Sequence, residues 1–165
     1  MSSRLGVISM MAWGCAHAPP PSPPEPSPPL PLAKRELAVI PAESDAFPQV
    51  ARAVSTELAA AKVAGMDETR LSKVSLEVVQ LAIECVEPTG TCYEAIGRSL
   101  AANRLLFARI DGAPGARRGG KRPLKVTVTL FDVDAKSAAR TAEREFASEA
   151  DATAGAAALV EEVTR

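Results

Sequence analysis

Cys15 is the residue whose position points most directly to chemistry. It follows Gly14 at the end of an apolar run, Leu5–Trp13, and Arg4 precedes that run. A charged start, an apolar stretch of about 7–15 residues and a small residue before the cut are the pattern of a secretory signal peptide. A thiol directly after that small residue is a site for a covalent anchor. The alternatives are plain secretion, a buried helix with a cytosolic start, and an uncleaved membrane span, which needs about 20 apolar residues.

The four residues Ala12-Trp13-Gly14-Cys15 resemble the lipobox of bacterial lipoproteins. This resemblance implies thioether acylation of Cys15, cleavage before it and acylation of the new amino terminus, so that residues 1–14 are a signal peptide. Stable anchoring takes more than one acyl chain, which the acylated cysteine supplies. Ala16, where inner-membrane lipoproteins carry Asp, implies by the family's sorting rule an outer-membrane lipoprotein that faces the periplasm.

Cys85 and Cys92 are the other two cysteines of the chain, and a turn-like segment that contains Pro88-Thr89-Gly90 separates them. In an exported chain they predict a structural disulfide, whose short loop contributes about 2–3 kcal/mol in the chain-entropy model. The alternatives are a redox pair and half of a metal site. The usual redox spacing is C-x-x-C, and a metal site needs two more ligands, so the disulfide is favoured.

Four positive charges lie within the glycine-rich segment Gly112–Pro123: Arg117, Arg118, Lys121 and Arg122. A phosphate cradle would have to open a helix, whereas this segment lies between two predicted strands. We expect an exposed loop that binds anionic headgroups, lipopolysaccharide phosphates or an acidic protein face. The alternative is a hairpin tip that charge keeps soluble.

The sequence predicts no catalytic set, no metal site and no cofactor. The single histidine, His17, lies in the tether, so neither a histidine-based triad nor a histidine metal cluster can form in the domain. G-x-S-x-G, H-E-x-x-H and phosphate-loop motifs do not occur. The carboxylates with suggestive spacing lie among Lys136, Arg140 and Arg144, which indicates an exposed strand of mixed charge; they are Asp132, Asp134, Glu143 and Glu145.

Composition limits the domain organisation and the partners. A chain of 165 residues with net charge −1 fits one modest domain and offers no broad positive field for nucleic acid. Residues 19–32 contain nine prolines, which predicts an extended polyproline spacer, with a ligand for a proline-reading groove as the alternative. We therefore expect a tether at 15–33 and a single domain at 34–165.

Apolar spacing predicts the elements of that domain. Strands are expected at 36–41, 63–68, 104–111, 124–131 and 138–146, and helices at 46–62, 71–85, 93–102 and 151–163. Asp45 is the expected N-cap of the first helix, and the last helix should bury Ala154, Ala158, Leu159 and Val163. The apolar stripe that marks the helix at 71–85 as amphipathic is Leu71, Val74, Val78, Leu81, Ala82 and Cys85. Residues 138–146 also suit a helix, but a plausible turn at 134–137 favours a strand. The order of elements predicts an α+β fold, with helices packed on one face of a small, mainly antiparallel sheet.

The run Ala95–Leu106 and the hairpin that ends Leu130-Phe131-Asp132-Val133-Asp134 resemble a pattern found in periplasmic domains of cell-envelope assembly proteins. These include the amino-terminal domain of the TolB type and the flagellar lipoprotein FlgO type, and domains of proline-linked myxobacterial lipoproteins are similar. The resemblance covers about residues 36–146. It implies an assembly or interaction module without catalytic residues.

Together these patterns predict a non-enzymatic outer-membrane lipoprotein that acts as a periplasmic interaction module in the cell envelope. Its membrane contact is the lipid anchor, and its partner is an envelope protein bound at Arg140–Phe146 or at the loop Arg117–Arg122. The alternative is a periplasmic binding module for a small envelope-derived ligand such as a peptidoglycan fragment. That function would need a concave pocket with convergent polar groups.

Overall fold

The computed structural model describes residues 34–85, 87–112 and 122–165. The predicted signal peptide and tether, with Cys15 and His17, lie outside these ranges, as do Arg117, Arg118 and Lys121. The described residues belong to one compact unit, Ala33–Arg165.

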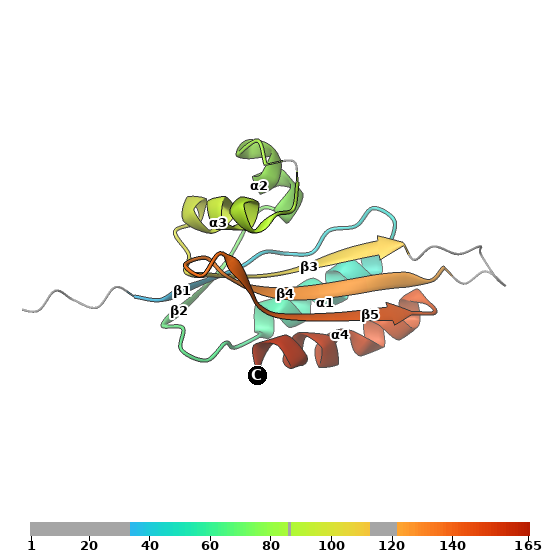
Figure 1. Cartoon of the computed structure of the whole chain (residues 1–165). Coiled ribbons are helices and arrows are strands. Elements are labelled where there is room, and N and C mark those ends of the chain that lie inside the picture. The colour runs from blue at the N-terminus through green and yellow to red at the C-terminus, as the bar shows by residue number, and fades with distance from the viewer. Residues whose placement is uncertain (1–33, 86, 113–121) are drawn as a thin grey trace, which may run out of the picture. The chain divides into compact units, whose positions relative to one another are not determined.

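Five strands form one mixed sheet in the order β2-β1-β3-β4-β5 (Figure 1). The strand β1 (Glu36–Val39) runs parallel to β2 (Glu68–Leu71) on one side and to β3 (Arg104–Gly112) on the other. Strands β3, β4 (Leu124–Asp132) and β5 (Ser137–Phe146) form an antiparallel meander. The fold is α+β with a mostly antiparallel sheet, as the sequence predicts.

Helices cover both faces of this sheet. α1 (Pro48–Ala60) and α4 (Glu149–Thr164) lie on one face, and α2 (Leu76–Ala82) and α3 (Gly90–Ser99) on the other (Figure 1). The expectation of a single covered face therefore needs correction. The connection from β1 to β2 crosses the sheet in one direction. The connection from β2 to β3 crosses it in the opposite direction, past β1. Two right-handed crossovers in opposite directions must lie on opposite faces.

The larger core layer lies between the sheet and the pair α1 and α4. β4 alternates as predicted, with Leu124, Val126, Val128 and Leu130 turned into this layer. Helix α4 buries Leu159 and Val163 as expected, but Ala154 and Ala158 are exposed. Ala152, Ala156 and Val160 are buried in their place, at positions i, i+4 and i+8 of one helix face. Val163 continues this face by one more turn in a helix that starts at Glu149.

The smaller core layer lies between α2, α3 and the other face of the sheet. It contains Leu105, Phe107, Phe131 and Val133 from the strands and their flanks, and Leu76, Val79 and Ile96 from the helices. Gly97 allows α3 to approach the sheet, because a Cβ at this position would overlap both γ-methyl groups of Val133. This contact gives a physical reason for glycine in the run Ala95–Leu106.

Several element boundaries differ from the predicted ones. The strand expected at 63–68 lies at Glu68–Leu71, because Gly65, with φ +76°, makes a turn where a strand would have to continue. Asp45 does not cap α1; the hydroxyl of Ser44 accepts a hydrogen bond from the amide of Phe47, and Pro48 opens the helix. Helix α3 starts three residues earlier than expected, at Gly90, because the hydroxyl of Thr89 caps the amide of Cys92 at 3.3 Å.

The strand at 138–146 is confirmed as β5, paired with β4 along its length. A tight turn at 133–136 reverses the chain before it, and the amide of Ala135 donates a hydrogen bond to Asp132 Oδ1 at 2.9 Å. The turn residues therefore decide between strand and helix in a segment whose composition suits both.

Candidate functional site

Of the four residues predicted to form a basic loop, the described part of the chain contains Arg122. Its Nη1 donates a hydrogen bond to the carbonyl of Ala46 at 3.2 Å, and its guanidinium lies over the ring of Phe47, 4.9 Å from the centroid. Arg122 thus packs against the residues that precede α1. The other three cations lie outside the described residues.

The charged residues of β5 make contacts within the domain. Glu143 lies 3.3 Å from Lys125 Nζ and accepts a hydrogen bond from the hydroxyl of Thr127 at 3.2 Å. Arg144 pairs with Glu162 of α4 at 3.3 Å. Exposed charges along a sheet edge discourage pairing with another strand. Within the predicted binding edge Arg140–Phe146, Glu143 and Arg144 therefore form intramolecular ion pairs, and partner binding at this edge stays a prediction.

Two carboxylates, one at the end of β4 and one in the turn that follows, contact residues next to the start of β3. Asp132 Oδ2 lies 3.5 Å from Nε of Arg104, and Asp134 accepts a hydrogen bond from the Asn103 amide at 3.4 Å. These contacts link the start of β3 to the turn. Their geometry is that of structural ion pairing, as the mixed charge of the segment predicts.

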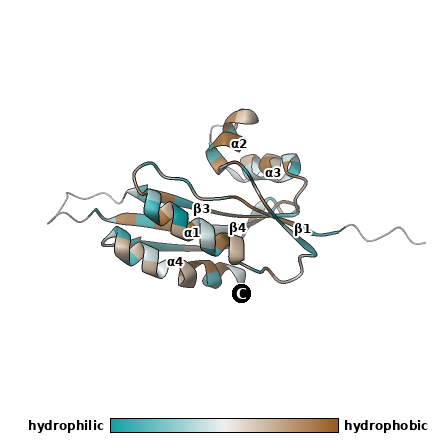
Figure 2. Ribbon diagram, turned by 180° about the vertical axis from the view of Figure 1, so that it is seen from behind, coloured by the Kyte–Doolittle hydropathy of each residue, from teal (hydrophilic) through white to brown (hydrophobic). Residues whose placement is uncertain are grey.

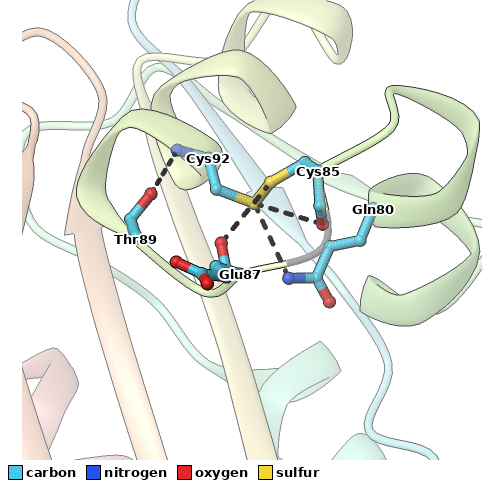
Figure 3. The surroundings of a disulfide bond; sticks show 5 residues. All are labelled: Gln80, Cys85, Glu87, Thr89 and Cys92. Carbon is cyan, nitrogen blue, oxygen red and sulfur yellow. Dashed lines mark hydrogen bonds between the residues drawn. A yellow bond between two sulfur atoms is a disulfide. The ribbon is translucent and has the colours of Figure 1, made fainter.

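Cys85 and Cys92 are joined in the structure, with their Cα atoms 5.7 Å apart (Figure 3). Cys92 is buried in the first turn of α3, and the side-chain amide of Gln80 donates to its sulfur at 3.6 Å. The bond ties the segment after α2 to α3. It therefore fixes where α2 lies on the smaller core layer.

Helix α2 and the residues before it expose most of the apolar side chains that were expected to face inward. The exposed fractions are 55% for Leu71, 41% for Val74, 48% for Val78 and 77% for Leu81. The predicted inward stripe is wrong because Leu71 belongs to β2 and the helix starts only at Leu76. A second stripe, Leu76 and Val79 followed by Ile83, packs on the sheet instead.

We call Leu71, Val74, Val78 and Leu81 the α2 surface. Hydrophobic residues on α2 are visible in Figure 2. A hollow of about 520 Å³ beside Leu81 is lined by Glu77, Gln80, Glu84 and Cys85. Another, of about 360 Å³, lies between Leu71, Val74 and the end of α3 at Leu100. Large apolar side chains rimmed by polar residues mark interaction sites on protein surfaces.

A third hollow, of about 160 Å³, opens between α2, α3 and the outer half of β3. Its lining residues are Leu76, Glu77, Gln80, Pro88, Tyr93 and Arg109. The ring of Tyr93 packs on Phe107 and Phe131, with centroids 4.8 and 5.4 Å away. Burial raises the pKa of Tyr93, while the positive charge and hydrogen bonding of Arg109 act in the opposite direction.

Sequence reasoning missed this hollow because its charged residues come from segments far apart in the chain. One signal was present: Arg109 interrupts the buried run Leu105–Ala108, and Tyr93 is the only tyrosine. The described part of the chain contains no group of three His, Cys, Asp or Glu side chains placed to hold a metal ion, and no helix with the length and apolarity to cross a bilayer.

No protein-family model matches the sequence, and no curated protein matches it. Among solved structures, the chain is similar to the PelC dodecamer from Paraburkholderia phytofirmans, with 16% identity, a TM-score of 0.43, and coverage of 80% of this chain and 90% of that one. A single-substitution variant of the same PelC dodecamer gives 17% identity, a TM-score of 0.41, and coverage of 79% and 86%. The hypothetical protein CT253 from Chlamydia trachomatis gives 16% identity, a TM-score of 0.35, and coverage of 70% and 74%.

Proposed function

We propose that this chain is a non-enzymatic lipoprotein of the bacterial outer membrane, and that its domain is a periplasmic interaction module of the cell envelope. Acylation at Cys15 anchors it, and the proline-rich residues 19–32 space the domain from the membrane. The partner is an envelope protein. The TolB-type and FlgO-type resemblance of residues 36–146 supports this assignment.

The observation that carries the interaction-module part of the proposal is the α2 surface. Four large aliphatic side chains within the segment Leu71–Leu81 are between 41% and 77% exposed. Burying apolar area stabilises a complex by roughly 25 cal/mol per Å² before the costs of association. A folded domain that leaves such residues in water gains from covering them with a partner.

The disulfide supports both parts of the proposal. Disulfides persist in oxidising compartments such as the periplasm. This one holds α2 against α3, so the α2 surface is a fixed feature for a partner to meet. A fixed surface loses little conformational entropy on binding.

Site-specific photo-crosslinking in the full-length chain tests the proposed surface. A photo-reactive residue at Leu81 should crosslink to a defined envelope protein when the chain is expressed in its source bacterium. The same residue at Ala154, exposed on α4, is the matched control and should give no such product. Crosslinks of equal yield and identity from both positions would contradict the proposal.

A variant with Val78→Ser and Leu81→Ser separates binding from folding. Both side chains are exposed, so the melting temperature should change little, whereas association with the crosslinked partner should fall about tenfold or more. The control variant carries Ala154→Ser and Ala158→Ser on α4. Unchanged association in the α2 variant would remove this surface from the account.

A further inference from the structure

The hollow beside Tyr93 brings two opposite charges to one small space. Arg109 enters from β3 and Glu77 from α2, and both line the same 160 Å³. They do not form an ion pair with each other, since the ion pair of Arg109 is a long one to Asp111 Oδ1, at 3.9 Å. A ligand that carries both charges can therefore lie between them.

Arg109 is suited to a carboxylate. Its guanidinium is a planar fork of five donors that matches the two carboxylate oxygens, so its hydrogen bonding with Tyr93 and its long contact to Asp111 leave donors for a ligand. The side chain is 46% exposed, so a ligand can reach it from solvent. Hydrogen bonds in which both groups are charged are roughly twice as strong as neutral ones.

Glu77 and Gln80 are suited to an ammonium group. They lie one turn apart on α2 and line the same hollow. The amide nitrogen of Gln80 already donates to Cys92 Sγ, so its oxygen is the atom that remains as an acceptor. A carboxylate and an amide oxygen together satisfy the donors of an ammonium group.

The remaining walls are apolar, and the space is small. Leu76, Pro88 and the Tyr93 ring line its apolar side, and the tilted packing of Tyr93 on Phe107 and Phe131 fixes that ring. A volume of 160 Å³ corresponds to about five waters at roughly 30 Å³ each. A single amino acid with a small side chain is of this size.

We propose that this hollow binds an α-amino-acid centre with a free carboxylate and a free ammonium group. Arg109 takes the carboxylate, Glu77 and Gln80 take the ammonium, and the Tyr93 ring covers a small apolar side chain. The site shares Glu77 and Gln80 with the hollow beside Leu81, but alanine binding and partner crosslinking are measured independently, so either proposal can fail without the other. It gives a specific chemistry to the small envelope-derived ligand that the sequence leaves open as an alternative.

Tyr93 provides a direct readout because it is the only tyrosine in the chain. In full-length protein labelled at tyrosine, the ring resonances should shift and saturate on titration with alanine. N-acetylalanine, which lacks the ammonium, and alaninamide, which lacks the carboxylate, should each bind about tenfold more weakly or worse.

Variants test the assigned roles. Arg109→Gln and Glu77→Gln should each weaken alanine binding about tenfold or more, with the unliganded tyrosine spectrum and the melting temperature little changed. Arg140→Gln, at an exposed position on β5, is the control and should bind alanine as the wild type does. Equal shifts with alanine and both blocked analogues, or no saturable shift with alanine, would overturn the proposal.

Discussion

The guanidinium of Arg122 lies over the ring of Phe47, 4.9 Å from its centroid, and joins the end of the predicted basic loop to the residue before α1. Phe47 is almost fully buried, so Arg122 covers a core side chain. An arginine in this position stabilises the folded domain through its contact with the aromatic ring and through packing of its aliphatic stem, as well as through its charge.

Arg122→Ala should therefore destabilise the domain by about 1 kcal/mol, which corresponds to a fall of about 4 °C in melting temperature. Arg122→Lys should retain part of this because it keeps a cation near the ring. Thermal unfolding followed by circular dichroism measures both. A melting temperature unchanged in Arg122→Ala would show that the contact with Phe47 contributes nothing.

The other cations of the loop should supply whatever anion binding it has. A variant that neutralises Arg117, Arg118 and Lys121 should lose as much binding to anionic vesicles as one that also neutralises Arg122, because Arg122 is engaged with Ala46 and Phe47. Co-sedimentation with anionic vesicles at low and high salt measures the loss. The wild-type signal should fall with salt, since exposed charges are screened over about 8 Å at physiological ionic strength. Equal vesicle binding by the wild type and the triple variant would show that the loop does not bind anionic membranes.

The bond between Cys85 and Cys92 should stabilise the domain by about 2–3 kcal/mol in the chain-entropy model. Reductant, or Cys85→Ser, should lower the melting temperature and increase solvent access to Leu76 and Val79, which α2 buries, because the bond ties the segment after α2 to α3. Free-thiol counting on protein from the periplasm is the direct test. Two reactive thiols in the native domain would contradict the prediction.

Glu94 should make stability depend on pH in the acid range. Its carboxylate lies 3.1 Å from Lys136 Nζ and 2.9 Å from Arg98, and these contacts, Lys136 first, lower its pKa. A carboxyl whose pKa is lower in the folded state than in the unfolded state stabilises the fold when it is ionised. This stabilisation is fully present above the unfolded-state pKa and is lost as pH falls through the folded-state pKa. Glu94→Gln should therefore be less stable than wild type near neutral pH, and the gap should close below the ordinary Glu pKa of about 4.3.

Urea unfolding over a pH series measures this gap. Glu43→Gln, at an exposed position outside the ion pairs found among the described residues, is the control. It should track the wild type at every pH. A gap between Glu94→Gln and wild type that is the same at all pH values would assign the effect to packing instead.

The antiparallel meander of the sheet was predictable because its signal is local. The alternation from Leu124 to Leu130 specifies one buried face of β4, and the turn at 133–136 specifies that β5 returns beside it. The face of the sheet that each helix covers could not be predicted from local sequence. It depends on β1 lying between β2 and β3, so that the two crossovers run in opposite directions.

The candidate sites show the same contrast. Cys85 and Cys92 are near in sequence, and their pairing is readable from the spacing. The α2 surface was predicted to lie in the core, because a count of apolar residues cannot tell which of two stripes a short helix buries. Arg109 and Glu77 come together only through the packing of α2 and α3 on β3, which the sequence does not display.

The central claim, that this chain is an envelope lipoprotein, rests on Cys15 and is tested most directly by metabolic labelling with palmitate followed by cell fractionation. The account predicts that the wild-type protein carries label and sediments with the outer membrane. Cys15→Ala should be unlabelled and released or mislocalised, with the fold of its domain intact. An unlabelled wild-type protein in the cytosol would contradict the account.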